Sequence, residues 1–403
     1  MKFPRTLLKV SAVLMVAAIM TACGGVASSS RGVPRQPPPP PTGANYTTCN
    51  GQQVPNWQFS TFQTDYQAAI TAFVNHYSSN SSVRYMRIGL GKGGEINLPQ
   101  GWNDSSSGAC YGGYSGTWGY TVGGSSANSS TWNTYLAGMV NYEANISTSK
   151  TLLVSITPIT GSGTATDDFI AGVATPLGIS FGNQGLESSD ISNYPNCGGD
   201  WCNLFGQYHP AIAELQTLGQ SCPTGSCSSS LSNNTGPLPP LLPFAILHGA
   251  NDLEIYYQDW LIAYDSTYAS SVGVDATTAA SYKTAIQAAA QTPGVSVQVL
   301  FPPQSFETDY PAVQQYLMNN PDVTGAVISV DWSDIEPSQG NFDFQTITDA
   351  TIAPWINAGK QVNLVFQNTT YGGSGNCPNS GIGSKGNVGS NCAMPQWMWT
   401  VLQ

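Results

Sequence analysis

The chain has 403 residues and a formal net charge of −11, with 9% charged and 41% hydrophobic residues. An acidic chain that is poor in lysine and arginine is a poor candidate for binding nucleic acid, because it would repel the phosphate backbone. Few charges together with many aromatic residues favour an exported protein that handles a neutral polar ligand.

The first residues have the layout of an export signal. A charged start, Met1–Arg5, precedes an apolar run over about residues 10–20, which is too short to span a bilayer permanently. Cys23 then follows small residues. This pattern resembles the bacterial lipoprotein signal, which implies a signal peptide over 1–22, a lipid on Cys23 and a membrane-anchored protein of the cell envelope. A plain secretory signal that is cleaved nearby is the alternative.

Residues 23–45 have the composition of a linker. They are rich in serine and proline and include the run Pro37 to Pro41. Such a segment favours a stiff, extended spacer over a packed domain. We therefore expect one folded domain, over residues 46–403.

Downstream, hydrophobic periodicity predicts strands that alternate with helices. The predicted strands cover residues 83–91, 151–157, 177–181, 211–217, 252–257, 295–301, 323–332 and 361–366. The predicted helices cover residues 58–77, 132–146, 167–174, 202–209, 237–248, 268–290, 310–319 and 344–358. Strand–helix alternation with this number of strands favours the α/β class and a closed (β/α)8 TIM barrel, in which the loops after the strands build the active face.

The cysteines indicate disulfides that staple long loops. Cys23 aside, an even number of cysteines follows the export signal, which is typical of an oxidising compartment. Three pairs are close in sequence and two cysteines remain: Cys197/Cys202, Cys222/Cys227, Cys377/Cys392, and then Cys49 and Cys110. The sequence leaves the connectivity open. A zinc site is the alternative, but the chain has only three histidines, and none lies in ligand spacing with these cysteines.

The segment Val83–Glu95 is the first candidate for a functional site. It begins as a buried strand and ends in four glycines within six positions, followed by Glu95. Glycines allow tight turns and close approach to a ligand, and a strand end is where a parallel barrel presents a catalytic group. An ordinary turn with a solvated glutamate is the alternative. A second carboxylate, Glu214, lies in the predicted strand 211–217 together with Gln216.

Two segments resemble sugar-cleaving barrels. The segment Trp332-Ser-Asp-Ile-Glu-Pro-Ser-Gln-Gly-Asn-Phe-Asp-Phe344, with the later Met394-Pro-Gln-Trp397, resembles the second and third strands of retaining β-galactosidases and related clan A glycoside hydrolases. The segment Gly89-Leu-Gly-Lys-Gly-Gly-Glu-Ile-Asn-Leu-Pro99 is similar to the fourth-strand segment of β-amylases, whose glutamate is the general acid. In clan A the fourth-strand glutamate usually follows asparagine, whereas Gly94 precedes Glu95 here.

The order of these segments implies a circular permutation. Features of the fourth strand come first in this chain, and features of the second and third strands come last. On this interpretation strands four to eight occupy about 83–257 and strands one to three occupy 295–366, and the segment 394–403 would lead into 50–57. A barrel that closes on itself tolerates such permuted termini. The alternative is a truncated tandem array, in which this chain would lack a complete barrel.

The resemblance implies a pair of catalytic carboxylates, because glycosidic cleavage needs a proton donor and a nucleophile or base. On the permuted numbering, Glu95 ends the fourth strand and is predicted to be the acid. Glu214 lies on the seventh strand and is predicted to be the nucleophile or base. Lys92 would lower the pKa of Glu95 unless it points away. Glu254 is an alternative second carboxylate.

Further residues at the predicted strand ends are candidates for binding the substrate. They are Arg87, Asn97, Trp102, Gln216, Glu254, Tyr256, Asp331, Trp332 and Trp397. For Arg87 we favour a buried ion pair with an active-site carboxylate, because an arginine inside a strand needs a charged partner. For Asp331 and Trp332 a packing role is an equal alternative, and Glu336, before a proline, is predicted to be structural.

These residues together predict an exported glycoside hydrolase that cleaves O-glycosidic bonds of an oligo- or polysaccharide. No metal or organic cofactor is indicated. One alternative is a carbohydrate-binding surface lipoprotein that has a hydrolase-like barrel without the chemistry. Another is a structural surface protein in which the aromatic loops pack on each other and leave no cleft.

Overall fold

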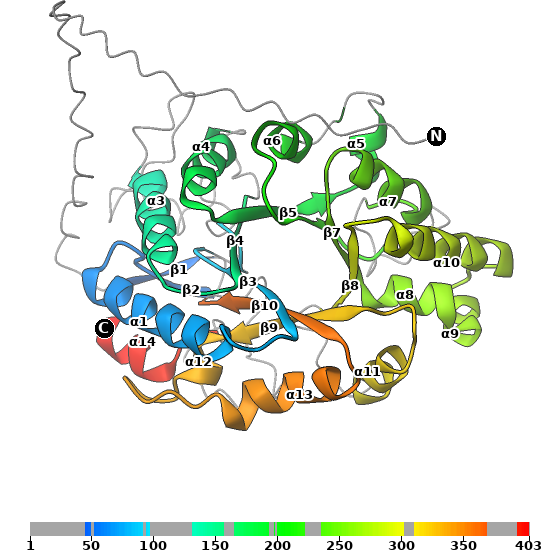
Figure 1. Cartoon of the computed structure of the whole chain (residues 1–403). Helices are drawn as coiled ribbons and strands as arrows, with labels where there is room; N and C mark the ends of the chain where they lie inside the picture. Colours follow the sequence, from blue (N-terminus) through cyan, green and yellow to red (C-terminus); the bar gives the residue numbers. More distant parts are fainter. Residues whose placement is uncertain are drawn as a thin grey trace, which may run out of the picture. The chain divides into compact units, whose positions relative to one another are not determined.

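A closed barrel of eight strands is the centre of the fold. The computed structural model describes residues 45–49, 52–91, 94–96, 131–156, 165–192, 197, 200–221, 235–301, 310–368 and 393–402. All of them belong to one compact unit, Gln36–Gln403. The strands follow one another around the ring in the order β10-β3-β4-β5-β6-β7-β8-β9, and the last pairs with the first (Figure 1). The predicted TIM barrel is confirmed, and the incomplete barrel expected of a truncated tandem array is contradicted.

Each neighbouring pair of barrel strands is parallel. The strands are β3 (Val83–Ile88), β4 (Thr151–Ser155), β5 (Ser180–Leu186), β6 (Ala213–Thr217), β7 (Asp252–Tyr256), β8 (Ser296–Leu300), β9 (Gly325–Asp331) and β10 (Gln361–Gln367). Every predicted strand overlaps one of them.

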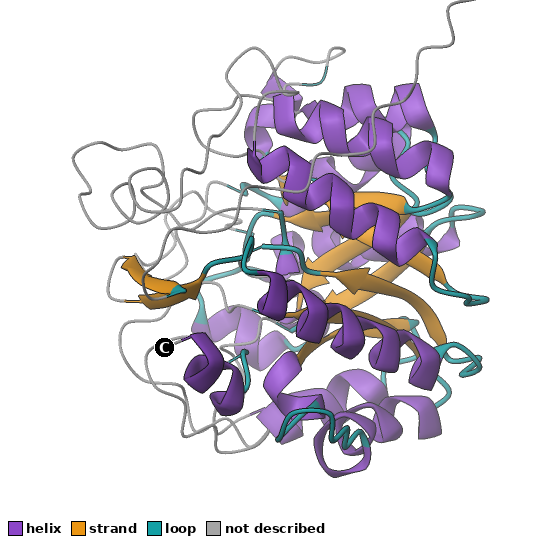
Figure 2. Ribbon diagram, turned by 90° about the vertical axis from the view of Figure 1, so that its left-hand side faces the viewer, coloured by secondary structure: helices purple, strands orange, loops and turns teal. Residues whose placement is uncertain are grey.

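Helices surround the strands (Figures 1 and 2). Those that fill the connections are α1 (Ser60–Tyr77), α3 (Thr131–Ala144), α4 (Ala165–Ala174), α6 (Asp200–Tyr208), α7 (Leu238–Leu247), α10 (Ala276–Gln291), α11 (Tyr310–Met318) and α13 (Ala350–Asn357). Shorter elements are η4 (Thr175–Leu177), α5 (Ser188–Ser192), α8 (Tyr257–Tyr264), α9 (Ser266–Ser271), α12 (Trp332–Ile335), η6 (Gln345–Asp349) and α14 (Gln396–Leu402). Within the described part of the chain, no helix has the length and apolar character needed to cross a lipid bilayer.

The helices pack through apolar stripes on the outer face of the barrel. In α1, the residues Phe62, Tyr66, Ile70 and Phe73 recur at helical spacing and are all fully buried. This is the stripe that the sequence pattern predicts. It meets the outward side chains of the strands, such as Phe366 of β10, whose ring stacks on that of Phe73 with 4.7 Å between centroids.

The strand predicted at 177–181 is displaced toward the C-terminus. Residues Thr175–Leu177 form a 3-10 turn, and β5 continues through Gly182-Asn-Gln-Gly185, which looks like a turn in the sequence. Gly182 belongs in the strand because the Glu214 carboxylate of the neighbouring β6 occupies the space where a Cβ would stand. A glycine inside a strand often marks such a close approach.

The two ends of the described unit lie side by side. A hairpin of β1 (Tyr46–Cys49) and β2 (Gln52–Pro55) precedes α1. The Asn45 amide donates to the Leu402 carbonyl at 2.9 Å, and the rings of Tyr46 and Trp399 are 6.0 Å apart. The C-terminal helix α14 therefore leads directly to the hairpin before α1, as the permuted order expects of residues 394–403 and 50–57.

Candidate active site

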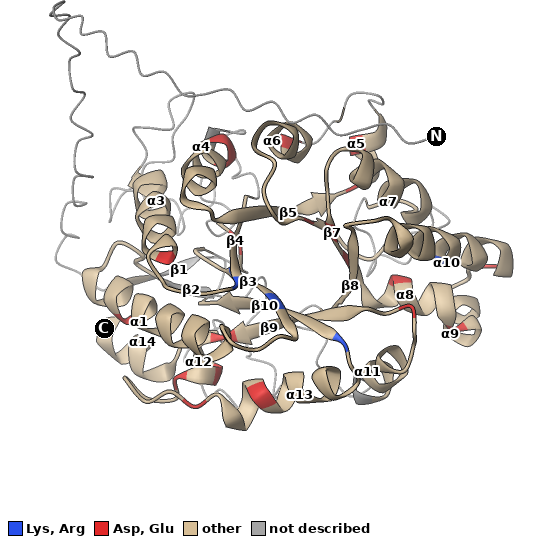
Figure 3. Cartoon of the chain, in the orientation of Figure 1, with Lys and Arg blue, Asp and Glu red and all other residues tan. Residues whose placement is uncertain are grey.

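The interior of the barrel holds a buried ion cluster. Arg87 of β3 places Nη1 3.0 Å from Glu214 Oε1 of β6 and 3.3 Å from Glu254 Oε2 of β7. Both glutamates are fully buried and Arg87 is 4% exposed. The buried ion pair expected for Arg87 is therefore present, and one guanidinium joins two carboxylates that are distant in sequence. Figure 3 shows blue segments on β3, one of the strands of the ring, and red segments on many of the surrounding helices.

Neutral polar side chains complete this cluster. The Tyr85 hydroxyl donates to Glu254 Oε1, and Gln184 Nε2 donates to Glu214 Oε2 at 2.9 Å. Ser155 in turn donates to the side-chain oxygen of Gln184. Each carboxylate oxygen of the pair thus faces a donor group, which is what allows charges to be buried.

An irregularity in β3 brings its side chains into the barrel. Val83 pairs with Val362 of β10, and Met86 pairs with Leu364. Two residues of β3 therefore lie between these pairs where β10 has one, so β3 holds one extra residue there. An extra residue changes which side the following residues face. Tyr85 and Arg87 therefore face inward, where both contact Glu254.

The electrostatics of the cluster favour retention of a proton. Burial raises the pKa of Glu214 well above its usual value, the negative charge of Glu254 raises it further, and Arg87 opposes both effects. One guanidinium cannot neutralise two carboxylates, so Glu214 keeps its proton at a higher pH than an ordinary glutamate does. Burial also raises the pKa of Tyr85, which therefore remains a hydroxyl donor.

A second polar group lies closer to the N-terminal ends of the strands. Arg84 forms an ion pair with the fully buried Asp252, and Asn363 Nδ2 lies 3.3 Å from Asp252 Oδ1. Burial raises the pKa of Asp252 to about 7, against the lowering effect of Arg84. In a barrel of this type, that end supports stability and the opposite end carries function.

At the carboxyl ends of the strands, polar groups from several strands face one another. The pKa of Tyr256 is raised to about 12 by burial and by the negative charge of Glu95, and its hydrogen bond with Gln216 opposes the rise. Glu95, after β3, thus acts on Tyr256 at the end of β7. Further along the rim, Gln367 Nε2 donates to Asp331 Oδ1 at 2.7 Å.

Trp332 and its neighbours form a packed group. Trp332 is fully buried, its ring is 5.2 Å from that of Tyr66, and its Nε1 donates to Glu336 Oε2 at 2.6 Å. Glu336 also accepts from the Gly340 amide at 2.7 Å, which agrees with its predicted structural role. Trp397 Nε1 donates to the Glu336 carbonyl at 3.0 Å. These contacts are those of packing residues.

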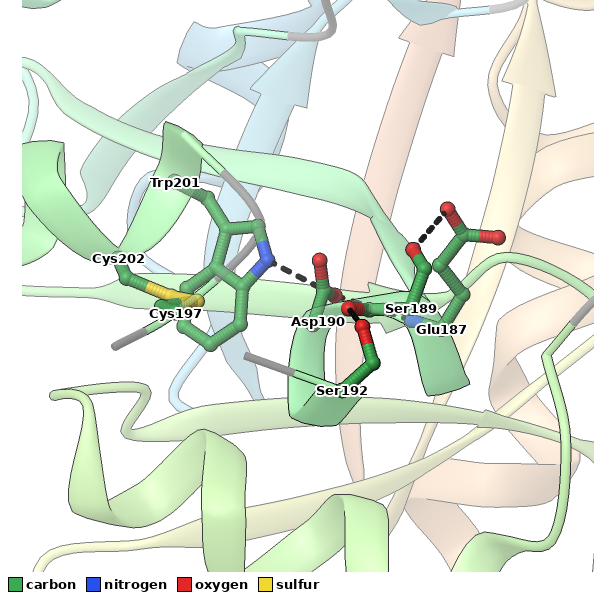
Figure 4. Close-up of a disulfide and its surroundings, with 7 residues drawn as sticks. All are labelled: Glu187, Ser189, Asp190, Ser192, Cys197, Trp201 and Cys202. Atoms are coloured by element: carbon green, nitrogen blue, oxygen red, sulfur yellow. Dashed lines mark hydrogen bonds between the residues drawn. A yellow bond between two sulfur atoms is a disulfide. The ribbon is translucent and has the colours of Figure 1, made fainter. Parts of the chain in front are cut away.

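One predicted disulfide is present. Cys197 and Cys202 are bonded with their Cα atoms 6.1 Å apart. The bond lies beside Trp201, whose Nε1 donates to Asp190 Oδ2 at 3.2 Å (Figure 4). Among the described residues, no group of three or more histidine, cysteine or acidic side chains could hold a metal.

The remaining predicted residues lie outside the described part of the chain. They are Lys92, Asn97, Trp102, Cys110, Cys222, Cys227, Cys377 and Cys392, together with the signal peptide, Cys23 and the linker up to residue 44. For Cys49 only the backbone is described.

Sequence reasoning missed several members of the two buried polar groups. Tyr85 stands two positions before Arg87, and Asp252 stands two positions before Glu254, so the period of a strand could have identified both. Gln184 and Ser155 gave no such signal. Gln184 lies beyond the end of the strand that the sequence predicts at 177–181.

Comparisons of this chain with known protein families, with curated proteins and with solved structures gave no match.

Proposed function

We propose that the protein is an exported glycoside hydrolase that cleaves O-glycosidic bonds of an oligo- or polysaccharide. Two observations carry the proposal: the charge of Glu95, which follows β3, acts on Tyr256 at the end of β7, and a buried pair of carboxylates in the same barrel shares Arg87. Polar side chains from β6, β7, β9 and β10 add groups that suit sugar hydroxyls. Its resemblance to clan A enzymes and β-amylases points to the same chemistry.

In this mechanism Glu95 donates a proton to the glycosidic oxygen as the bond to the anomeric carbon breaks. Glu214 either removes a proton from the attacking water or attacks the anomeric carbon itself. A raised pKa makes the ionised Glu214 a stronger base, which suits the first role. Arg87 and Gln184 would fix the direction of its carboxylate. Water supplies the hydroxyl and the proton that the two products gain.

A non-catalytic carbohydrate-binding protein is the second candidate, and one observation favours it. Glu214 has no exposed surface, and its two oxygens already contact Arg87 and Gln184. A group packed in this way reaches a substrate only if its neighbours rearrange. If they do not, the rim alone would bind sugars and no bond would be cleaved.

Export and anchoring belong to the same proposal. A lipid on Cys23 and the linker up to residue 45 would hold the barrel at a membrane of a bacterial envelope. Relative to the enzymes it resembles, we propose that the chain is circularly permuted, an order with which the contact between Asn45 and Leu402 is compatible.

The test is sugar release from a panel of glycans by the wild type, Glu95→Gln and Glu214→Gln, with glycan binding measured in parallel. Asp322→Asn is the matched control, because Asp322 accepts a hydrogen bond from Gln287 just before β9 begins, at the opposite end of the barrel. Both glutamine variants should lose at least about 100-fold in kcat, and the control should not. Equal activity in all variants would remove the catalytic assignment, and glycan binding without any release would favour the second candidate.

A further inference from the structure

The loop that carries Glu95 is held by side chains of two helices. The Tyr66 hydroxyl of α1 donates to the Gly89 carbonyl at 2.6 Å. From α3, the Tyr135 hydroxyl donates to the Leu90 carbonyl at 3.0 Å, and Trp132 Nε1 donates to the Ile96 carbonyl at 3.0 Å. The backbone is therefore fixed on both sides of Glu95.

The loop is also tied to the barrel and to itself. The Gly89 amide donates to the Phe366 carbonyl of β10 at 2.7 Å, and the Gly91 amide donates to the Glu95 carbonyl at 2.6 Å. Gly94 has a φ of +79°, and a Cβ on Gly89 would stand 2.5 Å from the Gly94 Cα. The glycines therefore allow a turn so tight that Glu95 is directed by the backbone.

The three donors are rigid. Tyr66 and Trp132 are fully buried and Tyr135 is 3% exposed. The rings of Trp132 and Tyr135 stack with their centroids 5.0 Å apart. Burial raises the pKa of both tyrosines well above the usual value, so their hydroxyls stay protonated and continue to donate.

We propose that Tyr66, Tyr135 and Trp132 are positioning residues for the Glu95 carboxyl. This inference rests on the proposed function, in which Glu95 is the proton donor. A proton donor must lie within hydrogen-bond reach of the glycosidic oxygen, and a displacement of about 1 Å can reduce a rate about 100-fold. In these contacts the three side chains donate only to backbone carbonyls of the loop. Their effect on catalysis would therefore be exerted through the position of Glu95.

The test uses Tyr66→Phe and Tyr135→Phe, each of which removes one hydroxyl from a packed ring. Tyr77→Phe is the matched control, since Tyr77 is 1% exposed, lies on the same helix as Tyr66 and donates to Asp349 away from the loop. Hydrogen exchange of the 89–96 segment should become about 3- to 10-fold faster in the first two variants and stay unchanged in the control. Their kcat should fall about 10- to 100-fold with little change in KM.

The pH profile of kcat distinguishes a positioning role from a structural one, because a loss of stability alone does not shift this profile. In Tyr66→Phe and Tyr135→Phe, the limb of the pH profile that reports ionisation of the proton donor should shift. In Tyr77→Phe this limb should stay at the wild-type pH. The inference is overturned if both variants match the control in exchange and in kcat, or if the loop exchanges faster while kcat and its pH profile stay unchanged. Glu95→Gln separates the two proposals, because full activity in that variant refutes Glu95 as the donor, whatever the tyrosines do.

Discussion

Glu143 on α3 allows a prediction that does not depend on function. Its carboxyl has no exposed surface, and neither oxygen has a hydrogen-bond partner. Burial raises the pKa of Glu143 well above 4.5. A buried carboxyl without partners must remain protonated in the folded state, whereas in the unfolded chain it ionises as an ordinary glutamate does.

The direction in which stability changes with pH follows from the difference between the folded and the unfolded pKa of Glu143. Because the folded pKa exceeds the unfolded one, the stability that protonated Glu143 contributes is fully present below the unfolded pKa and is lost as the pH rises toward the folded pKa. Each pH unit within that window costs about 1.4 kcal/mol. Between the unfolded pKa and pH 7, this cost reaches at most about 3.5 kcal/mol.

Replacing Glu143 with methionine removes this cost, because methionine has a similar volume and does not titrate. We expect Glu143→Met to be more stable than the wild type at pH 7, with an advantage that shrinks toward pH 4.5. The measurement is the free energy of unfolding in urea across this range. Glu143→Gln keeps the shape and also does not titrate, so its stability relative to the wild type should show the same pH dependence.

A difference between Glu143→Met and the wild type that does not change with pH would refute the reasoning. So would a wild type that is the more stable protein at pH 7. Asp275→Asn is a control of opposite sign, because the pKa of the exposed Asp275 is lowered by hydrogen bonds from the first turn of α10. That variant should lose stability relative to the wild type as the pH rises from the lowered folded pKa to the ordinary pKa of aspartate, and the difference should stay constant at higher pH.

Three more outcomes can be checked. Arg87→Met should cost about 3–5 kcal/mol in urea unfolding at pH 7, and less at pH 5, because two buried carboxylates lose their counter-ion. Gly182→Ala should cost about 1–3 kcal/mol in the same assay, because the added methyl meets the Glu214 carboxylate. A chain in which a short linker joins Leu402 to Asn45, with new ends in the turn between α10 and β8, should fold with an unchanged near-UV circular dichroism spectrum. Loss of that spectrum would contradict the adjacency of the two ends.

The succession of strands and helices could be predicted because it rests on local patterns. Most barrel strands hold a short group of apolar residues, and each long helix buries one stripe, so period and length distinguish them. The elements that the sequence missed lack such a pattern. Helix α8 begins at Tyr257, directly after β7 ends at Tyr256, and no turn residue separates the two. The β1–β2 hairpin is too short to show a period.

The candidate site could be predicted only in part, because its chemistry depends on which strands close the ring. Arg87 needs a buried counter-ion wherever it lies inside a strand, and this could be inferred from one residue. That Glu214 and Glu254 would share it depends on β3, β6 and β7 facing one lumen, which only a closed barrel provides.

The polar lumen also explains why the strand pattern misleads at β5. An apolar lumen would require large side chains at alternate positions of every strand. Here Gly182 leaves space for the Glu214 carboxylate, and Gln184 supplies a hydrogen bond to it, so a glycine and a polar amide are required within a strand. A charged group buried inside a barrel therefore determines residue types on the neighbouring strand, and local propensity cannot reveal that requirement.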